Sequence, residues 1–240
     1  MKNFKLYAMI FALLPLLNFA QEDDKYVMVE TIQIHVKAGA DKAFVKAVKA
    51  HNEAYHPEDS PYNAWLEAIV TGPNTGTYVW LMGSTTFTEL DNRPDGEHDD
   101  EWDKNVMKHV ESVSMIEYWK RMDKLSYRPE NYEGGPLDEL WFIAVKRGEF
   151  YRFEGVLEKV VAVQEKLGQP MGVWSSVFNA NDGRDIAISW NRKGWAGFDN
   201  DVNFRKAFEE MHGEGSWMKL MNEWEDCTDS IMQEVWADVE

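Results

Sequence analysis

Apolar and polar residues alternate along one stretch of the chain and then recur at helical spacing along the next. In residues 30–37, β-branched apolar residues alternate with polar ones, which predicts a strand with one buried face. Gly39 marks a turn, and apolar residues between Phe44 and Tyr55 then recur at the spacing of a helix. The pattern therefore predicts a strand followed directly by an amphipathic helix.

The same pattern returns 109 positions later. Residues 30–69 align with residues 139–178 without a gap, and the identities follow the predicted order of strand, turn, helix and strand. In the first copy the identical residues are Glu30, Ile34, Val36, Lys37, Gly39, Phe44, Pro61 and Trp65. We interpret this agreement as an internal duplication.

Each copy continues into a predicted hairpin. In the first copy it pairs residues 65–71 with residues 77–84 across the turn GPNTG. In the second copy it pairs residues 173–179 with residues 185–190 across a turn that contains NDG. Asparagine or aspartate before glycine tolerates the positive φ that tight hairpins require, so the turns agree with the strands around them.

A second helix and a closing strand complete each copy. The second helices carry apolar residues at helical spacing. They are Trp102, Val106, Val110 and Val113 in the first copy, and Phe204, Ala207, Phe208 and Met211 in the second. We expect the closing strands over residues 114–123 and 231–240, because a glutamate stands two residues before a tryptophan in both.

The order in each copy is β-α-β-β-α-β, which predicts an α+β fold of two tandem ferredoxin-like units. We place the units at residues 26–125 and 137–240, with a linker rich in proline and glycine at residues 126–136. Helices would cover one face of each sheet and leave the other bare. We expect the bare faces to bury each other, which gives a pseudo-dimeric α+β barrel, as a monomer or a homo-oligomer.

This arrangement resembles the dimeric α+β barrel superfamily in tandem form, which includes NIPSNAP-like, antibiotic-biosynthesis-monooxygenase-like, haem-degrading and chlorite-dismutase-like proteins. The resemblance covers residues 26–240 and is architectural, because the chain carries no short motif specific to one member. It implies a pocket between the sheet and the helices of one unit. Haem-degrading relatives place an axial histidine on a helix of the second kind, which makes His109 the position to test for haem.

Polar residues on the apolar face of the first helix are the first candidates for a ligand site. His51 and Tyr55 share that face with Phe44, and the second copy has Val160 and Gln164 at the two equivalent positions. This divergence is consistent with a pocket kept only in the first unit. The alternative is that His51 is a hydrogen-bonded histidine of the core.

Two further groups of polar residues are candidates. His35 and Gln33 lie on the polar side of the first strand, where the second copy is apolar, and they need partners or a ligand if that side faces the barrel interior. A wet barrel mouth is the alternative. His109 lies at the edge of the apolar stripe of the second helix, where a solvated boundary histidine is the alternative to a haem ligand.

Metal centres and nucleophilic sites have little support. Residues 91–102 and 199–210 resemble calcium loops, but Trp102 replaces the bidentate glutamate of the first and Phe204 replaces the glycine of the second. His98 and its acidic neighbours could hold an incidental divalent ion. The alternative is that these acidic residues stabilise the start of a helix through its dipole. We predict no metal centre. The single cysteine, Cys227, has acidic neighbours that disfavour a thiolate.

Charge and the amino-terminal segment restrict the partners and the location. Residues 1–20 have the layout of a secretory signal, with two lysines before an apolar run that ends at Ala20. Removing this segment leaves 23 basic and 42 acidic residues, a formal charge of −19. Such a surface repels phosphate backbones, so we expect no nucleic-acid partner. We expect no transmembrane segment after signal removal.

These observations favour a secreted or periplasmic protein that binds a small apolar or aromatic molecule without a dedicated cofactor. The absence of a catalytic motif favours a binding protein over an enzyme. The first alternative is a haem-binding or cofactor-independent monooxygenase-type enzyme that uses His109 or His51. The second alternative is a non-catalytic scaffold that binds other proteins through its acidic surface.

Overall fold

The computed structural model describes residues 26–93, 96–178, 182–199 and 203–239. The predicted signal segment, residues 1–20, lies outside these ranges, and secretion stays a prediction. The first unit contains β1 (Met28–Val36), α1 (Asp41–Tyr55), β2 (Ala64–Thr71), β3 (Tyr78–Thr85), α2 (Phe87–Leu90), α3 (Glu97–Glu101), a π-helical turn (Trp102–Val106), a 3₁₀ turn (Met107–His109) and β4 (Val110–Arg121).

A 3₁₀ turn (Asp123–Leu125) begins the connection to the second unit. The second unit contains β5 (Leu137–Val145), α4 (Phe150–Leu167), β6 (Gly172–Ser176), β7 (Ile186–Arg192), a 3₁₀ turn (Trp195–Asp199), α5 (Phe204–His212), α6 (Ser216–Cys227) and β8 (Thr228–Asp238). Within the described part of the chain, no helix is long and apolar enough to cross a membrane.

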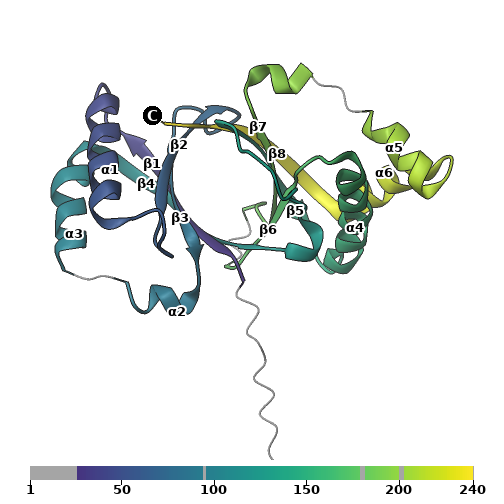
Figure 1. Ribbon diagram of the computed structural model, residues 1–240, viewed down its shortest axis with the longest axis horizontal. Coiled ribbons are helices and arrows are strands. Elements are labelled where there is room, and N and C mark those ends of the chain that lie inside the picture. The colour runs from purple at the N-terminus through teal and green to yellow at the C-terminus, as the bar shows by residue number, and fades with distance from the viewer. Residues whose placement is uncertain (1–25, 94–95, 179–181, 200–202, 240) are drawn as a thin grey trace, which may run out of the picture.

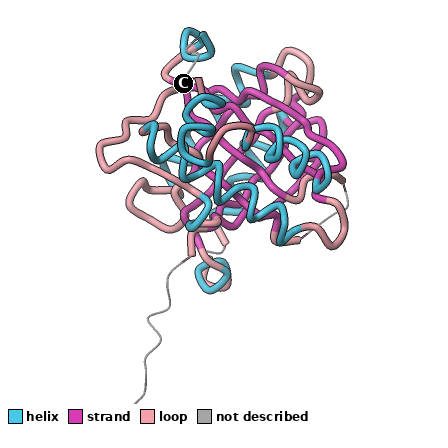
Figure 2. The backbone as a smooth tube through the Cα atoms, turned by 90° about the vertical axis from the view of Figure 1, so that its right-hand side faces the viewer, coloured by secondary structure: helices cyan, strands magenta, loops and turns pink. Residues whose placement is uncertain are grey.

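The eight strands close into one antiparallel barrel in the order β1-β3-β2-β8-β5-β7-β6-β4. Each unit contributes four adjacent strands, and the pairs β2–β8 and β4–β6 join the two units. Figure 1 shows the barrel nearly end-on, with the helices outside it. In the view turned by 90°, α4, α5 and α6 lie in front of the strands (Figure 2). The predicted pseudo-dimeric α+β barrel is confirmed.

The internal duplication is visible in the element bounds. Moving β1 along the chain by 109 positions gives residues 137–145, which are the bounds of β5. The same shift moves the first residue of α1, Asp41, onto the first residue of α4, Phe150. The repeated pattern in the sequence therefore corresponds to a repeated structure.

The inner faces of the two half-sheets form one shared core, as expected from two bare faces that bury each other. The buried residues of this core are Val29, Ile69, Val79, Leu81, Trp119, Leu140, Phe142, Ala187 and Trp236. An ion pair is buried beside it, in which Arg184 donates to Glu117 at 2.8 and 2.9 Å and lies over the Phe142 ring. Separate apolar clusters join the outer face of each half-sheet to its own helices.

The second helix of the first unit differs from the prediction. The helical region ends at His109, so Val110 and Val113 belong to β4 and not to a helix. A spacing of three or four residues indicates a helix only where one side is buried, and Val113 is 40% exposed at the start of its strand. The second unit also carries the additional helix α6 before β8.

Candidate functional site

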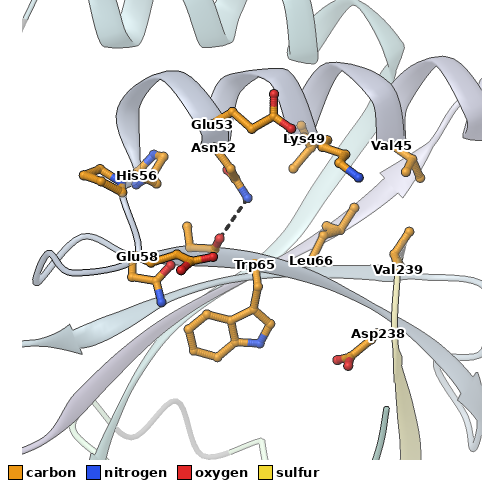
Figure 3. Close-up of a pocket in the computed structure, with 14 residues that line it drawn as sticks. Val45, Lys49, Asn52, Glu53, His56, Glu58, Trp65, Leu66, Asp238 and Val239 are labelled. Carbon is orange, nitrogen blue, oxygen red and sulfur yellow. Dashed lines mark hydrogen bonds between the residues drawn. The ribbon is translucent and has the colours of Figure 1, made fainter. Parts of the chain in front are cut away.

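A cleft of about 980 Å³ opens between α1 and β2 in the first unit (Figure 3). Val45, Val48 and Leu66 supply apolar surface from the facing sides of the helix and the strand. Asp238 and Val239, at the end of β8, close one end of the cleft. The remaining residues that line it are Lys49, Asn52, Glu53, His56, Pro57, Glu58, Asn63, Ala64 and Trp65.

A fixed amide joins the helix to the strand at the cleft. Asn52 of α1 donates through Nδ2 to the carbonyl oxygen of Ala64, at 3.1 Å, as the dashed line in Figure 3 shows. Its Oδ1 atom accepts from Nε1 of Trp80 on β3, at 3.0 Å. Because both ends of the amide are held, the spacing between α1 and β2 is fixed at this point.

The charged residues around the cleft are mostly acidic. Lys49 is the basic side chain among the described lining residues, whereas Glu53, Glu58 and Asp238 carry carboxyl groups. Burial raises the pKa of Asp238 from its usual value. The cleft therefore has an electrostatic preference against anions.

Three histidine rings meet at the end of α1, beside the cleft. Nε2 of His56 lies 3.3 Å from Nε2 of His51 and 3.1 Å from Nε2 of His98. His51 projects from α1, His56 follows its last residue, and His98 belongs to α3. His51 and His56 are buried, with 0% and 6% of their surface exposed. Of the three, His56 lines the cleft, whereas His51 and His98 lie behind it and are not among its lining residues.

The Nδ1 atom of each ring has its own acceptor. Nδ1 of His51 donates to a carboxylate oxygen of Glu101 at 2.5 Å, and Nδ1 of His98 donates to Asp99 at 2.8 Å. Nδ1 of His56 donates to the backbone carbonyl oxygen of Tyr62 at 2.6 Å. These contacts fix the orientation of all three rings.

Burial opposes a positive charge on the two inner rings. Desolvation lowers the pKa of His51, although the hydrogen bond to Glu101 acts in the opposite direction. Desolvation also lowers the pKa of His56, to about 4. Partial burial would raise the pKa of Glu101, but hydrogen bonds from His51 and Asn105 outweigh it and lower this pKa. The inner imidazoles are therefore neutral at neutral pH.

Aromatic rings surround the three histidines. The Trp102 ring centroid is 4.9 Å from that of His51, and the Trp80 ring centroid is 5.2 Å from that of His56. Tyr55 packs between two of the histidines, with centroid distances of 5.1 Å to His51 and 5.4 Å to His98. The histidine group thus lies in a largely apolar shell.

The structure separates the other predicted site residues from this group. His109 ends the 3₁₀ turn before β4, and its carbonyl oxygen accepts from the amide of Lys37 at 2.9 Å. His35 is exposed on β1. Gln33 is buried in the barrel, where its Nε2 atom has no hydrogen-bond partner among the described residues. Of the predicted candidates, His51 and Tyr55 therefore lie together, and the other three lie elsewhere.

A smaller cavity of about 280 Å³ lies inside the barrel. Trp65 and Glu67 of β2 contribute to its wall, and Nε1 of Trp65 donates to Glu67 at 2.7 Å. Burial, followed by the charge of Asp138, raises the pKa of Glu67 to about 8. Burial also raises the pKa of Asp138 to about 6. The barrel interior therefore holds two carboxyl groups whose charged forms are disfavoured by burial.

Sequence reasoning did not connect His56 or His98 with His51, although it considered His98 and its acidic neighbours for an incidental ion. His56 follows the last residue of the first helix, so helical spacing did not include it. His98 stands among acidic residues, and their favourable interaction with the helix dipole was a sufficient explanation for that segment. The signal that could have connected them is the spacing of His98 and Glu101, three residues apart on one turn of helix, which lets both face His51.

The chain matches no family model and no curated protein. Solved structures do match. A candidate monooxygenase from Lactobacillus acidophilus has a TM-score of 0.56 at 9% identity, covering 88% of this chain and 93% of its own. A candidate monooxygenase from Fusobacterium nucleatum has a TM-score of 0.57 at 9% identity, covering 90% and 93%.

A chlorite dismutase from Candidatus Nitrospira defluvii, in complex with imidazole, has a TM-score of 0.51 at 7% identity, covering 88% of this chain and 91% of its own. At such identities the likeness establishes the fold alone. The chain has the dimeric α+β barrel fold, which confirms the resemblance inferred from the duplicated pattern.

Proposed function

We propose that this protein binds a small uncharged molecule with an aromatic or apolar body in the cleft between α1 and β2. The observation that carries the proposal is the cleft itself, which joins a floor of Val45, Val48 and Leu66 to a polar rim. Its volume of about 980 Å³ lies within the range of small-molecule sites, about 300–1,000 Å³. Most of its lining residues belong to the first unit, and His56 links it to the histidine group that includes His51.

The rim selects against negative charge. Three carboxyl groups against one ammonium group, on a chain of formal net charge −17, disfavour an anionic ligand. The amide of Asn52 is held at both ends by protein partners, so its orientation in the cleft is fixed. We therefore assign the ligand's affinity to apolar contact, with polar groups at the rim setting its orientation.

Calorimetric titration with two probes of equal size tests this proposal. At neutral pH 2-naphthol is uncharged, whereas 2-naphthoate is an anion of similar shape. We expect 2-naphthol to bind more tightly. The variant Val45→Trp, which fills the cleft, should weaken binding at least about tenfold, because it displaces the buried ring. The variant Lys46→Trp adds the same ring on the exposed side of α1 and should bind like the original protein.

Two results would overturn the assignment. One is tighter binding of 2-naphthoate than of 2-naphthol. The other is equal binding by the Val45→Trp and Lys46→Trp variants, which would place the ligand outside the cleft. Thermal melts of both variants accompany the titrations, so that loss of folding is distinguished from loss of the site.

The oxygenase alternative rests on the neighbouring structures, two of which are described as candidate monooxygenases. A haem held by His51 does not fit the geometry. An axial imidazole faces the open plane of a macrocycle, whereas Nε2 of His51 faces Nε2 of His56 at 3.3 Å. His109 is not among the residues that line the cleft or the barrel cavity. We therefore do not assign His51 or His109 as a haem ligand.

A further inference from the structure

We propose that His51, His56 and His98 form a binding site for a divalent transition metal ion of the zinc class. The proposal does not depend on the ligand assigned to the neighbouring cleft. Among the residues that the structure describes, these three offer one ligand atom each, all within 4.8 Å of one another. Four observations support the assignment.

The first observation is the spacing of the three Nε2 atoms. Zinc binds imidazole nitrogen at about 2.0–2.1 Å in tetrahedral geometry, which separates neighbouring ligand nitrogens by about 3.3 Å. The measured separations from His56 are 3.3 Å to His51 and 3.1 Å to His98. His51 and His98 therefore each lie beside His56 at the separation of ligands of one ion, and the three ligand atoms lie within 4.8 Å of one another.

The second observation is the position of the ring protons. The carbonyl oxygen of Tyr62 can only accept, so Nδ1 of His56 must carry its proton. The carboxylates of Glu101 and Asp99 place the protons of His51 and His98 on Nδ1 in the same way. The other nitrogen of a neutral imidazole carries an unshared electron pair, and Nε2 of His56 faces Nε2 of His51 and of His98.

Such an arrangement is repulsive unless a cation lies between the rings. A metal ion satisfies all three electron pairs at once. Histidine ligands usually donate their second nitrogen to a carboxylate or a carbonyl group, and all three rings do so here.

The third observation is the contrast with the second unit. The residue equivalent to His51 at the 109-residue shift is Val160, and it packs with apolar residues of α4, α5 and α6. Ala207, Phe208 and Leu220 occupy that interface. In the first unit three imidazoles stand where the second unit has apolar side chains. Burying their Nε2 atoms costs stability unless those atoms have a bound partner.

The fourth observation concerns access and chemistry. The side chain of His98 is 22% exposed, so the group can be reached from solvent. Three imidazoles suit zinc, copper, nickel or iron and not calcium or magnesium. A centre with three protein ligands keeps a position for water or another molecule, as catalytic zinc sites do. His56 joins this centre to the wall of the cleft.

The test is a competitive zinc titration of the full protein, after removal of metal with a chelator. We expect one zinc ion per chain. His98→Ala should weaken binding at least about 100-fold, because it removes a ligand, and Glu101→Ala by about 10- to 100-fold, because it removes the acceptor that orients His51. His109→Ala is the matched control, a histidine of the same unit outside the group, and it should bind zinc like the original protein.

A second readout replaces zinc by cobalt, whose visible absorption reports the coordination. We expect intense bands of a four-coordinate ion that are lost in His98→Ala and kept in His109→Ala. The proposal is overturned if the original protein binds zinc no more tightly than His98→Ala, which would indicate an adventitious ion on the acidic surface. It is also overturned if His109→Ala weakens binding as much as His98→Ala does.

Discussion

Glu67 gives a quantitative prediction about stability, because its carboxyl group is buried in the barrel with 4% of its surface exposed. Nε1 of Trp65 donates to it at 2.7 Å, and the charges of Asp138 and Asp238 oppose its ionisation. Arg121 and Arg128 also line the cavity. Burial is the largest influence, and the pKa of Glu67 is raised from 4.5 to about 8.

The sign of the pH dependence follows from linkage. The folded protein binds this proton more tightly than the unfolded chain, so stability is full below about pH 4.5 and falls as pH rises toward 8. One pKa unit corresponds to about 1.4 kcal/mol. Between pH 6 and pH 8 the ionisation of Glu67 should therefore remove roughly 2 kcal/mol from the free energy of unfolding. Asp138, whose pKa is raised to about 6, adds a loss at lower pH.

The variant Glu67→Gln keeps the shape and the acceptor for Trp65 but cannot ionise. We expect its stability relative to the original protein to rise by roughly 2 kcal/mol between pH 6 and pH 8, because the loss that Glu67 causes is absent. Urea unfolding at half-unit steps of pH measures this, with Glu58→Gln, a change of an exposed glutamate, as the control that should follow the original curve. Parallel curves for Glu67→Gln and the original protein would refute the assignment of the raised pKa.

Two further predictions concern buried charge and haem. Arg184→Met should lower the free energy of unfolding by about 3–5 kcal/mol, because it leaves Glu117 charged and unpaired in the barrel, and adding Glu117→Met should restore most of the loss in urea unfolding. A double variant as unstable as Arg184→Met would contradict this reasoning. Added haemin should give no Soret change that depends on His51 or His109, and a change abolished by His109→Ala would instead support the haem alternative.

The fold could be predicted because two periodicities agreed at a fixed shift. The strand and helix patterns after residues 30 and 139 match in register, and a sheet covered by helices on one face needs a partner for the other. The predicted second helix of the first unit was wrong at Val110 and Val113, where the buried positions do not alternate regularly. At the start of β4 the residues are mostly exposed, so the valines there do not show the period of a strand.

The candidate site could be predicted only in part. His51 was identified because it is a polar residue on an apolar helix face, and the aligned residue in the second copy is a valine. A buried polar side chain needs a hydrogen-bond partner or a ligand. His56 and His98 approach it through the path that the chain takes after α1 and before α3, and no periodic pattern records that path. Convergence of side chains from separate elements is a property of the tertiary structure.

The barrel architecture explains why the two units can differ so much at equivalent positions. The shared core lies on the inner faces of the strands and is formed by residues such as Trp119, Phe142 and Trp236. The layer between sheet and helices is formed mainly by the residues of one unit, although Val239 after β8 packs against the layer of the first unit. The outer layers of the two units can therefore differ while both units share one barrel core. In the second unit the outer layer packs apolar residues against α6. In the first unit the same layer holds buried imidazoles beside an open cleft.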